Sequence, residues 1–134
     1  MKQRILVIDD DEGVRLTVQH VLRTIGCEVR SARTCAEARQ IFDKFNPAVV
    51  ITDLIMPGEE GETFIRCLKK LSPDTRIVAM SGGARLGNSR ILEHAREAGA
   101  DRILSKPFAF GELVALVEHL AFERNPEALS SKLS

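Results

Sequence analysis

The sequence predicts an α/β fold in which five parallel strands alternate with five helices. Short apolar runs of the length of buried strands alternate along the chain with segments of helical periodicity. The runs lie at 5–8, around 29, and at 49–51, 77–80 and 103–104. Strands joined by crossover helices must be parallel, and such crossovers are right-handed, so few topologies remain. The alternation therefore predicts a (βα)5 unit folded as a three-layer sandwich.

The order of the strands follows from how apolar each run is. The runs at 5–8, 49–51 and 77–80 are continuous and apolar, as expected of interior strands that are covered on both faces. The runs around 29 and at 103–104 are shorter and flanked by charged residues, which is typical of edge strands. The order 2-1-3-4-5, the flavodoxin-like arrangement, satisfies both conditions and creates a topological switch point between the first and third strands.

The helices are predicted from a repeated apolar spacing of i, i+3, i+4 and i+7. This spacing is complete in the segments 18–25, 38–45, 64–71 and 113–120 and partial in 91–98. Thr34 and Glu37 form a capping-box pattern at the start of the second helix. Gly26 and Gly99 fall where the first and fourth helices are expected to end.

Length and composition indicate one domain. The chain has 134 residues, of which 44% are hydrophobic and 28% are charged, and this is enough for one continuous core. We expect a single domain over residues 1–124 and a short polar C-terminal tail over 125–134. Because 19 basic residues balance 19 acidic ones, we expect no direct binding of nucleic acid.

Features of secreted and membrane proteins are missing from the sequence. The apolar run that follows the basic N-terminus covers only 5–8, so we expect neither a signal peptide nor membrane association. Cys27, Cys35 and Cys67 form no Cys-x-x-Cys pair and fall in helical patterns, which predicts free thiols that are buried or half-buried. This cysteine usage suits a reducing compartment and predicts a cytoplasmic protein.

Polar residues follow four of the five predicted strands. Asp9 and Asp10 follow the first, Asp53 the third, Ser81 the fourth and Lys106 the fifth. In open α/β sheets, ligands bind outside the carboxyl ends of the strands, so these side chains are expected to meet there. Crowded carboxylates need a cation, and an all-oxygen set favours Mg²⁺. A carboxylate beside a hydroxyl and an ammonium group suits phosphoryl transfer.

Taken singly, each of these residues has a purely structural interpretation. An acidic run before a helix can cap its positive N-terminal end. Asp53 could cap the turn before 56–58, and Lys106 could be a solvated surface lysine. The convergence of four strand ends favours a functional site over these separate explanations.

Four motifs, taken in order, resemble the receiver domains of two-component response regulators. They are Val7-Ile8-Asp9-Asp10, the segment 51–58 (ITDLIMPG) with Gly61, Ala79-Met80-Ser81-Gly82, and the segment from Gly99-Ala100-Asp101 to Lys106-Pro107-Phe108. The resemblance covers residues 3–123, and a spaced set of this kind is highly specific.

The resemblance implies a role for each matching residue. Asp53 would be the phospho-acceptor, and Asp10 would bind Mg²⁺ with the assistance of Asp9. Asp53 and the backbone carbonyl of Ile55 would complete the protein's metal ligands. The partner implied upstream is a sensor histidine kinase or a phosphotransfer protein, and the chain would be a signalling switch, not an enzyme.

Ser81 and Lys106 would bind the phosphoryl group, and Lys106-Pro107 resembles a peptide bond that is often cis in the family. Two departures from the family pattern concern its output. Ile103 stands where the family usually has Tyr or Phe, and we expect the segment 82–88 to contain an insertion of about three residues by comparison with a compact chemotaxis receiver. We therefore expect output through helix four, strand five and helix five to an unknown downstream protein.

Two other functions fit parts of the same pattern. A haloacid-dehalogenase-type aspartyl-phosphate hydrolase also uses a strand-end aspartate and Mg²⁺, but that family has an acid two positions later, where this chain has Ile55. A pseudo-receiver would keep the fold and act only as a docking module.

Overall fold

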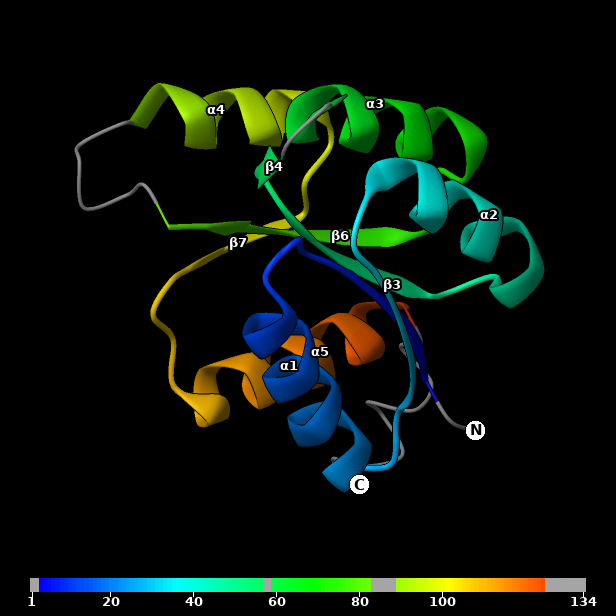
Figure 1. The fold of residues 1–134 in the computed structure, drawn as a ribbon, viewed down its shortest axis with the longest axis vertical. Helices are drawn as coiled ribbons and strands as arrows, with labels where there is room; N and C mark the ends of the chain where they lie inside the picture. Colours follow the sequence, from blue (N-terminus) through cyan, green and yellow to red (C-terminus); the bar gives the residue numbers. More distant parts are fainter. Residues whose placement is uncertain (1–2, 57–58, 83–88, 125–134) are drawn as a thin grey trace.

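The structure is a computed structural model that describes residues 3–56, 59–82 and 89–124 (Figure 1). Its elements in chain order are β1 (Arg4–Ile8), α1 (Glu12–Thr24), β2 (Glu28–Ala32), α2 (Cys35–Phe45), β3 (Val49–Asp53), β4 (Ile55–Met56), β5 (Glu59–Glu60), α3 (Gly61–Leu71), β6 (Arg76–Ser81), α4 (Ser89–Ala98), β7 (Arg102–Ser105) and α5 (Phe110–Arg124).

Five strands form one parallel sheet in the order β2-β1-β3-β6-β7. Because β6 and β7 are the fourth and fifth strands of the predicted unit, this order confirms the flavodoxin-like arrangement. Ile5 of β1 pairs with Val29 of β2 on one side and with Val49 of β3 on the other. All five residues of β3 are buried, as expected for a strand at the centre of a covered sheet.

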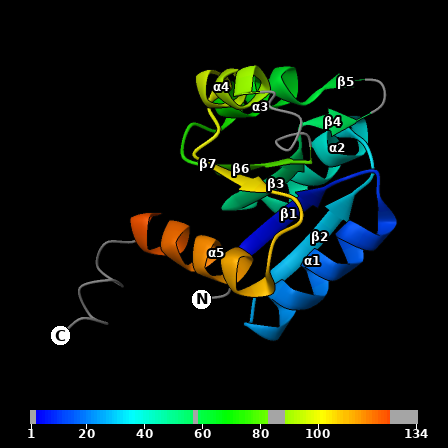
Figure 2. The same ribbon diagram turned by 90° about the vertical axis from the view of Figure 1, so that its left-hand side faces the viewer.

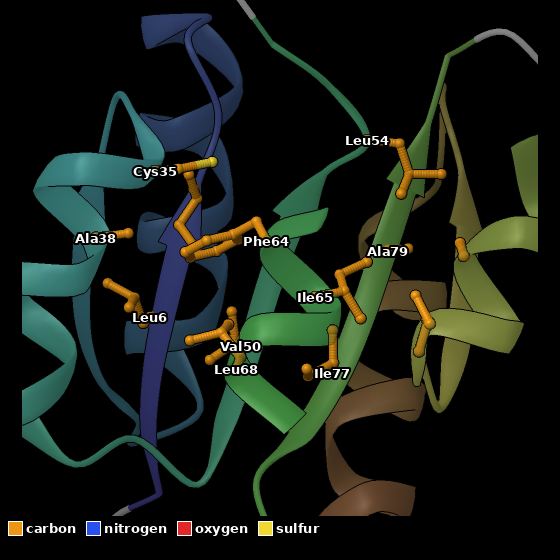
Figure 3. Packing of buried hydrophobic residues seen from close by; sticks show 14 of the residues in the cluster. Leu6, Cys35, Ala38, Val50, Leu54, Phe64, Ile65, Leu68, Ile77 and Ala79 are labelled. Carbon is orange, nitrogen blue, oxygen red and sulfur yellow. The ribbon is translucent and has the colours of Figure 1, made fainter. Parts of the chain in front are cut away.

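Helices cover both faces of the sheet and complete the three predicted layers. Helices α2, α3 and α4 lie on one face, and α1 and α5 lie on the other (Figures 1 and 2). In the first core, Phe64 and Leu68 of α3 pack toward Leu6 and Val50 of the sheet, and Ile65 lies beside Ile77 and Ala79 of β6 (Figure 3). A second core on the opposite face joins Val18, Val21 and Leu22 of α1 to Leu113, Val117 and Leu120 of α5.

The predicted helix boundaries are set by side-chain and backbone caps. The hydroxyl of Thr34 accepts a hydrogen bond from the Glu37 amide at 3.1 Å and so begins α2. Gly26 and Gly99 follow α1 and α4 with φ angles of +91° and +125°, which favour glycine. A Cβ on Gly99 would also lie 2.5 Å from Cγ of Lys69, so this turn is closely packed against α3.

Three details differ from the sequence prediction or extend beyond it. A short antiparallel pair, β4 and β5, follows β3 and was not predicted, because two-residue strands show no periodicity. Cys27 lies between α1 and β2, so its assignment to a helix was wrong: α1 ends at Thr24, and Gly26 turns the chain with a positive φ before Cys27. The predicted tail 125–134 and, apart from Gly82, the predicted insertion 82–88 lie outside the described residues.

Candidate functional site

The carboxyl ends of four strands bring the predicted site residues to one edge of the sheet. Asp9 and Asp10 follow β1, Asp53 ends β3, Ser81 ends β6, and Lys106 follows β7. Strands β1 and β3 are neighbours although α1, β2 and α2 lie between them in sequence. The edge therefore coincides with the switch point at which open α/β sheets bind their ligands.

Three aspartates form a compact group of oxygen ligands. One carboxylate oxygen from each of Asp9, Asp10 and Asp53 lies within 4.8 Å of the other two. Asp9 and Asp53 are buried, with 1% and 8% of their surface exposed, whereas Asp10 is exposed. In the described part of the chain, this is the only such group of acidic, histidine or cysteine residues. Its all-oxygen donor set fits a hard divalent cation such as those that receivers bind.

Lys106 lies between the two buried carboxylates. Its Nζ is 2.7 Å from Oδ2 of Asp9 and 3.2 Å from Oδ2 of Asp53. Burial lowers the pKa of Lys106, but the bonds and the attraction to Asp9 and Asp53 outweigh burial and raise this pKa above its ordinary value. The ammonium group therefore remains charged and balances part of the negative charge of the aspartates.

The carboxylate of Asp53 is held in place by a hydrogen bond, but its surroundings disfavour the ionised form. Its Oδ1 accepts a hydrogen bond from the Ile55 amide at 3.2 Å. Burial raises the pKa of Asp53 above its ordinary value, and the nearby charge of Asp9 adds to this effect. The Ile55 amide and Lys106 act in the opposite direction without cancelling it. Both pKa values are raised, which favours the charged form of Lys106 and the neutral form of Asp53.

The acidic residues that follow β1 have two different roles, helix capping and membership of the aspartate group. Asp11 is the N-cap of α1, and its Oδ1 accepts a hydrogen bond from the Val14 amide at 3.3 Å. The capping interpretation therefore holds for Asp11, whereas Asp9 and Asp10 contribute to the aspartate group. The Asp11 amide in turn donates to Oδ1 of Asp9 at 2.9 Å, which fixes the buried carboxylate beside the start of the helix.

The remaining predicted site residues border this group. Ser81 is buried with 2% of its surface exposed, and its carbonyl accepts a hydrogen bond from the Lys106 amide at 2.8 Å. The peptide bond between Lys106 and Pro107 is cis. The side chain of Ile55 is exposed, with 59% of its surface accessible.

Sequence reasoning did not single out Arg15 of α1. This arginine is buried, with 8% of its surface exposed, and its guanidinium donates to the backbone carbonyl of Asp9 at 2.8 Å. The only available signal was an arginine at a position of α1 next to the apolar stripe, and that signal is weak.

A cavity of about 560 Å³ opens beside the site. It lies between the start of α1 and the segment that joins β7 to α5, and its lining includes Asp11, Val14, Lys106, Phe108 and Phe110. The cavity therefore has apolar side chains in its wall and borders Lys106 of the site.

Comparison with known sequences decides the family. A model of the response regulator receiver domain matches residues 5–118. The chain belongs to this family. It is thus a two-component receiver domain with an acidic cluster at the phosphorylation site of the family, and receiver domains are generally not classed as enzymes.

Individual relatives agree with this assignment. The DNA-binding transcriptional regulator NtrC of Azospirillum brasilense is 36% identical over 124 residues, which cover 92% of this chain and 25% of that protein. The transcriptional regulatory protein PrrA of Mycobacterium tuberculosis is 34% identical over 128 residues, covering 96% and 54%. A CheY-like receiver domain protein from Methanospirillum hungatei has a similar crystal structure, with a TM-score of 0.85, 27% identity, and coverage of 95% of this chain and 99% of that chain.

The receiver chain spans between a quarter and about half the length of these two regulatory relatives. Among the helices that the structure describes, none has the length and apolar character needed to cross a membrane.

Proposed function

We propose that this receiver takes a phosphoryl group from a sensor histidine kinase or a phosphotransfer protein onto Asp53, in a reaction that requires Mg²⁺. The observation that carries this proposal is the position of the Asp53 carboxylate. It lies 3.2 Å from the ammonium of Lys106 and within 4.8 Å of oxygens from Asp9 and Asp10. A nucleophile, a cation that can balance the phosphoryl charge and a set of oxygen ligands for a metal therefore lie together at the carboxyl edge of the sheet.

The proposed reaction is a transfer between a histidine and an aspartate. An oxygen of Asp53 attacks the phosphorus of a phosphohistidine, an oxygen–phosphorus bond forms, and the nitrogen–phosphorus bond breaks. The imidazole leaves with the electron pair and takes up a proton. Lys106 supplies positive charge next to the acceptor, and Ser81 supplies a hydroxyl from the neighbouring strand.

In this proposal, Asp9, Asp10, Asp53 and the carbonyl of Ile55 hold Mg²⁺. The three carboxylates fit this role because they offer close oxygen ligands and carry negative charge that Lys106 only partly balances. Bound Mg²⁺ supplies positive charge that neutralises the phosphoryl oxygens as charge develops on them. Asp9 and Lys106 then keep the acceptor carboxylate and its surroundings in place through the contacts already described.

The rival functions have less support. A hydrolase of the haloacid-dehalogenase type needs a proton donor two residues after its nucleophile, and the apolar side chain of Ile55 cannot supply one. A pseudo-receiver that only docks is disfavoured because the chain has every residue that the phosphorylation site of the family requires.

We further propose residues 1–124 as the receiver unit and the cytoplasm as its location, since its phosphodonors act there. The output face would be formed by α4, β7 and α5, and the downstream partner would be a protein. The equal numbers of acidic and basic residues favour a protein over nucleic acid as the direct partner of this unit.

Labelling with a small-molecule phosphodonor tests the proposal. Incubation with acetyl phosphate and Mg²⁺ should add one phosphoryl group at Asp53, as an acyl phosphate that is stable in acid and cleaved by base or hydroxylamine. Asp53→Asn should abolish labelling, whereas Asp43→Asn, which changes an exposed aspartate of α2, should leave it intact. Labelling of Asp53→Asn at the wild-type rate would exclude Asp53 as the acceptor.

A further inference from the structure

Arg15 is a buried charged residue whose visible partner is a backbone oxygen near the acidic site. Arginine is rarely buried unless its charge is compensated. Arg15 has only 8% of its surface exposed, and its NH1 donates to the carbonyl oxygen of Asp9 at 2.8 Å. A buried guanidinium therefore contacts the main chain of one of the three clustered aspartates.

The carbonyl that Arg15 holds belongs to the peptide group that joins Asp9 to Asp10. A peptide group is planar, so a bond to its oxygen restricts the rotation of the whole unit. This rotation determines how the Cα–Cβ bonds of the two aspartates are directed relative to each other. The buried Asp9 is also fixed by Lys106, but Asp10 is exposed and depends more strongly on its backbone for its direction.

Further bonds tie the same short loop to the start of α1. The Asp11 amide donates to Oδ1 of Asp9 at 2.9 Å, and the Arg15 amide donates to the carbonyl of Asp11 at 3.1 Å. Arg15 thus contacts the loop twice, with its main chain at Asp11 and its side chain at Asp9. These contacts connect the rigid helix to both ends of the segment that contains Asp10.

We propose that Arg15 is a positioning residue, which sets the direction of the Asp9 and Asp10 carboxylates toward a divalent cation by holding their shared peptide group. This inference rests on the proposed function, in which these carboxylates bind Mg²⁺. Mg²⁺ demands nearly ideal octahedral geometry, so a loosened ligand lowers its affinity. The positive charge of Arg15 acts in the opposite direction, because it repels the ion. The geometric effect is the larger one in this proposal.

The test compares Mg²⁺ affinity in variants of the whole chain. The chain has no Trp and no Tyr, so binding is followed by calorimetry and by the backbone amide signals of Asp10 and Asp11 in NMR. Arg15→Met should raise the Kd for Mg²⁺ about tenfold, as is usual when a group that supports a metal ligand is removed. Arg15→Lys keeps a donor and the charge and should recover most of the affinity.

Arg23→Met is the matched control. Arg23 lies on the same helix and also donates to a backbone carbonyl, that of Val29 at 3.1 Å, but at the opposite end of α1 from the acidic site. This variant loses the same kind of bond and the same charge, so a general loss of helix stability would affect both variants. We expect its Kd for Mg²⁺ to match the wild type.

Asp10→Asn separates the failure of this inference from the failure of the proposed function. If Asp10→Asn weakens Mg²⁺ binding while Arg15→Met binds as well as or better than wild type, the positioning role is wrong and the metal site stands. If neither variant changes the Kd, both ideas are wrong. Should Arg15→Met fail to fold, Arg15→Gln takes its place, since glutamine lacks the charge and the reach; an unchanged Kd there would equally overturn the proposal.

Discussion

Lys106 connects Asp9 and Asp53, although α1, β2 and α2 lie between these two residues in the sequence. Its shorter bond is to Asp9, and its longer one is to Asp53. Burial is the main cause of the raised pKa of Asp53, and the nearby charge of Lys106 does not cancel it. The acceptor proposed for phosphorylation is therefore the less well compensated of the two buried carboxylates.

Replacement of Asp53 should consequently stabilise the metal-free protein. Burial raises the pKa of Asp53 in the folded state, so the folded protein binds a proton more tightly than the unfolded chain at this position. Stability contributed by this group is present at low pH and is lost as the pH rises through the raised pKa. Without divalent ions at pH 7, Asp53→Asn should therefore raise the free energy of unfolding.

Urea denaturation of both proteins over a pH series measures this effect. The difference in stability should shrink as the pH falls toward the ordinary pKa of an aspartate, because the wild-type carboxyl group is then protonated and neutral like the amide. A difference that stays constant over the whole range would mean that the ionisation of Asp53 does not cause it.

The side chain of Ile55 bears on how long a phosphoryl group would persist on Asp53. It lies two residues after the proposed acceptor, is exposed, and offers no polar atom to position an attacking water. Ile55→Asn should therefore speed the loss of the phosphoryl group, while Ile55→Val should decay at the wild-type rate. The release of inorganic phosphate from the labelled proteins measures these decay rates. Equal rates in the wild type and the two Ile55 variants would show that other residues control the access of water.

At the scale of the elements, the start of α3 is packed closely against the backbone that follows β3. Gly61 begins α3, and a Cβ at this position would lie 2.7 Å from backbone atoms of Leu54, directly after Asp53, the proposed acceptor. Its amide also donates to the Leu54 carbonyl at 3.2 Å. The absence of a side chain thus allows α3 to begin against the end of β3.

A pair of alanine substitutions tests this contact. Gly61→Ala should lower the free energy of unfolding by about 2 kcal/mol or more, because two backbone segments would have to separate. Gly111→Ala in α5 is the control: a Cβ there meets no atom within 4 Å, and alanine favours a helix, so stability should stay equal or rise slightly. Thermal unfolding measures both, and equal effects would show that the space at Gly61 is unimportant.

On the scale of the whole molecule, the proposed output face lies at the β7 edge of the sheet, opposite the edge formed by β2. Ser81 ends β6, and Lys106 begins the segment after β7. A phosphoryl group that binds both residues would therefore act on these two strands and on α4, which lies between them in sequence. Ile103 of β7 is only partly buried and packs against the core on the α4 side. A ligand shifts a conformational population only through contacts that differ between the two states, and these two residues could supply them.

Hydrogen exchange with and without beryllofluoride, which mimics a phosphoryl group on aspartate, tests this face. We expect increased protection concentrated between residues 82 and 102, and no change in Asp53→Asn, which lacks the carboxylate that the mimic requires. Protection confined to α1 and α2 would contradict this output face and would favour a chain that only relays phosphate.

The sequence by itself determined the order of the elements and selected the candidate site residues. The alternating apolar runs and helical spacings are local patterns, and they fixed which strands lie inside the sheet, because an interior strand must be apolar on both faces. Thr34 and Glu37 begin α2 as their spacing predicts. Asp9, Asp10, Asp53, Ser81 and Lys106 could be selected because parallel strands bring their carboxyl ends to one edge.

Only the tertiary structure decided what each charged group contacts. It divided the acidic run into a helix cap at Asp11 and the clustered carboxylates of Asp9 and Asp10, and it placed Lys106 between carboxylates that follow or end two different strands. It also revealed Arg15 beneath the loop that contains Asp10. These outcomes depend on burial and on distances between segments remote in sequence, and no local pattern of residues encodes either quantity.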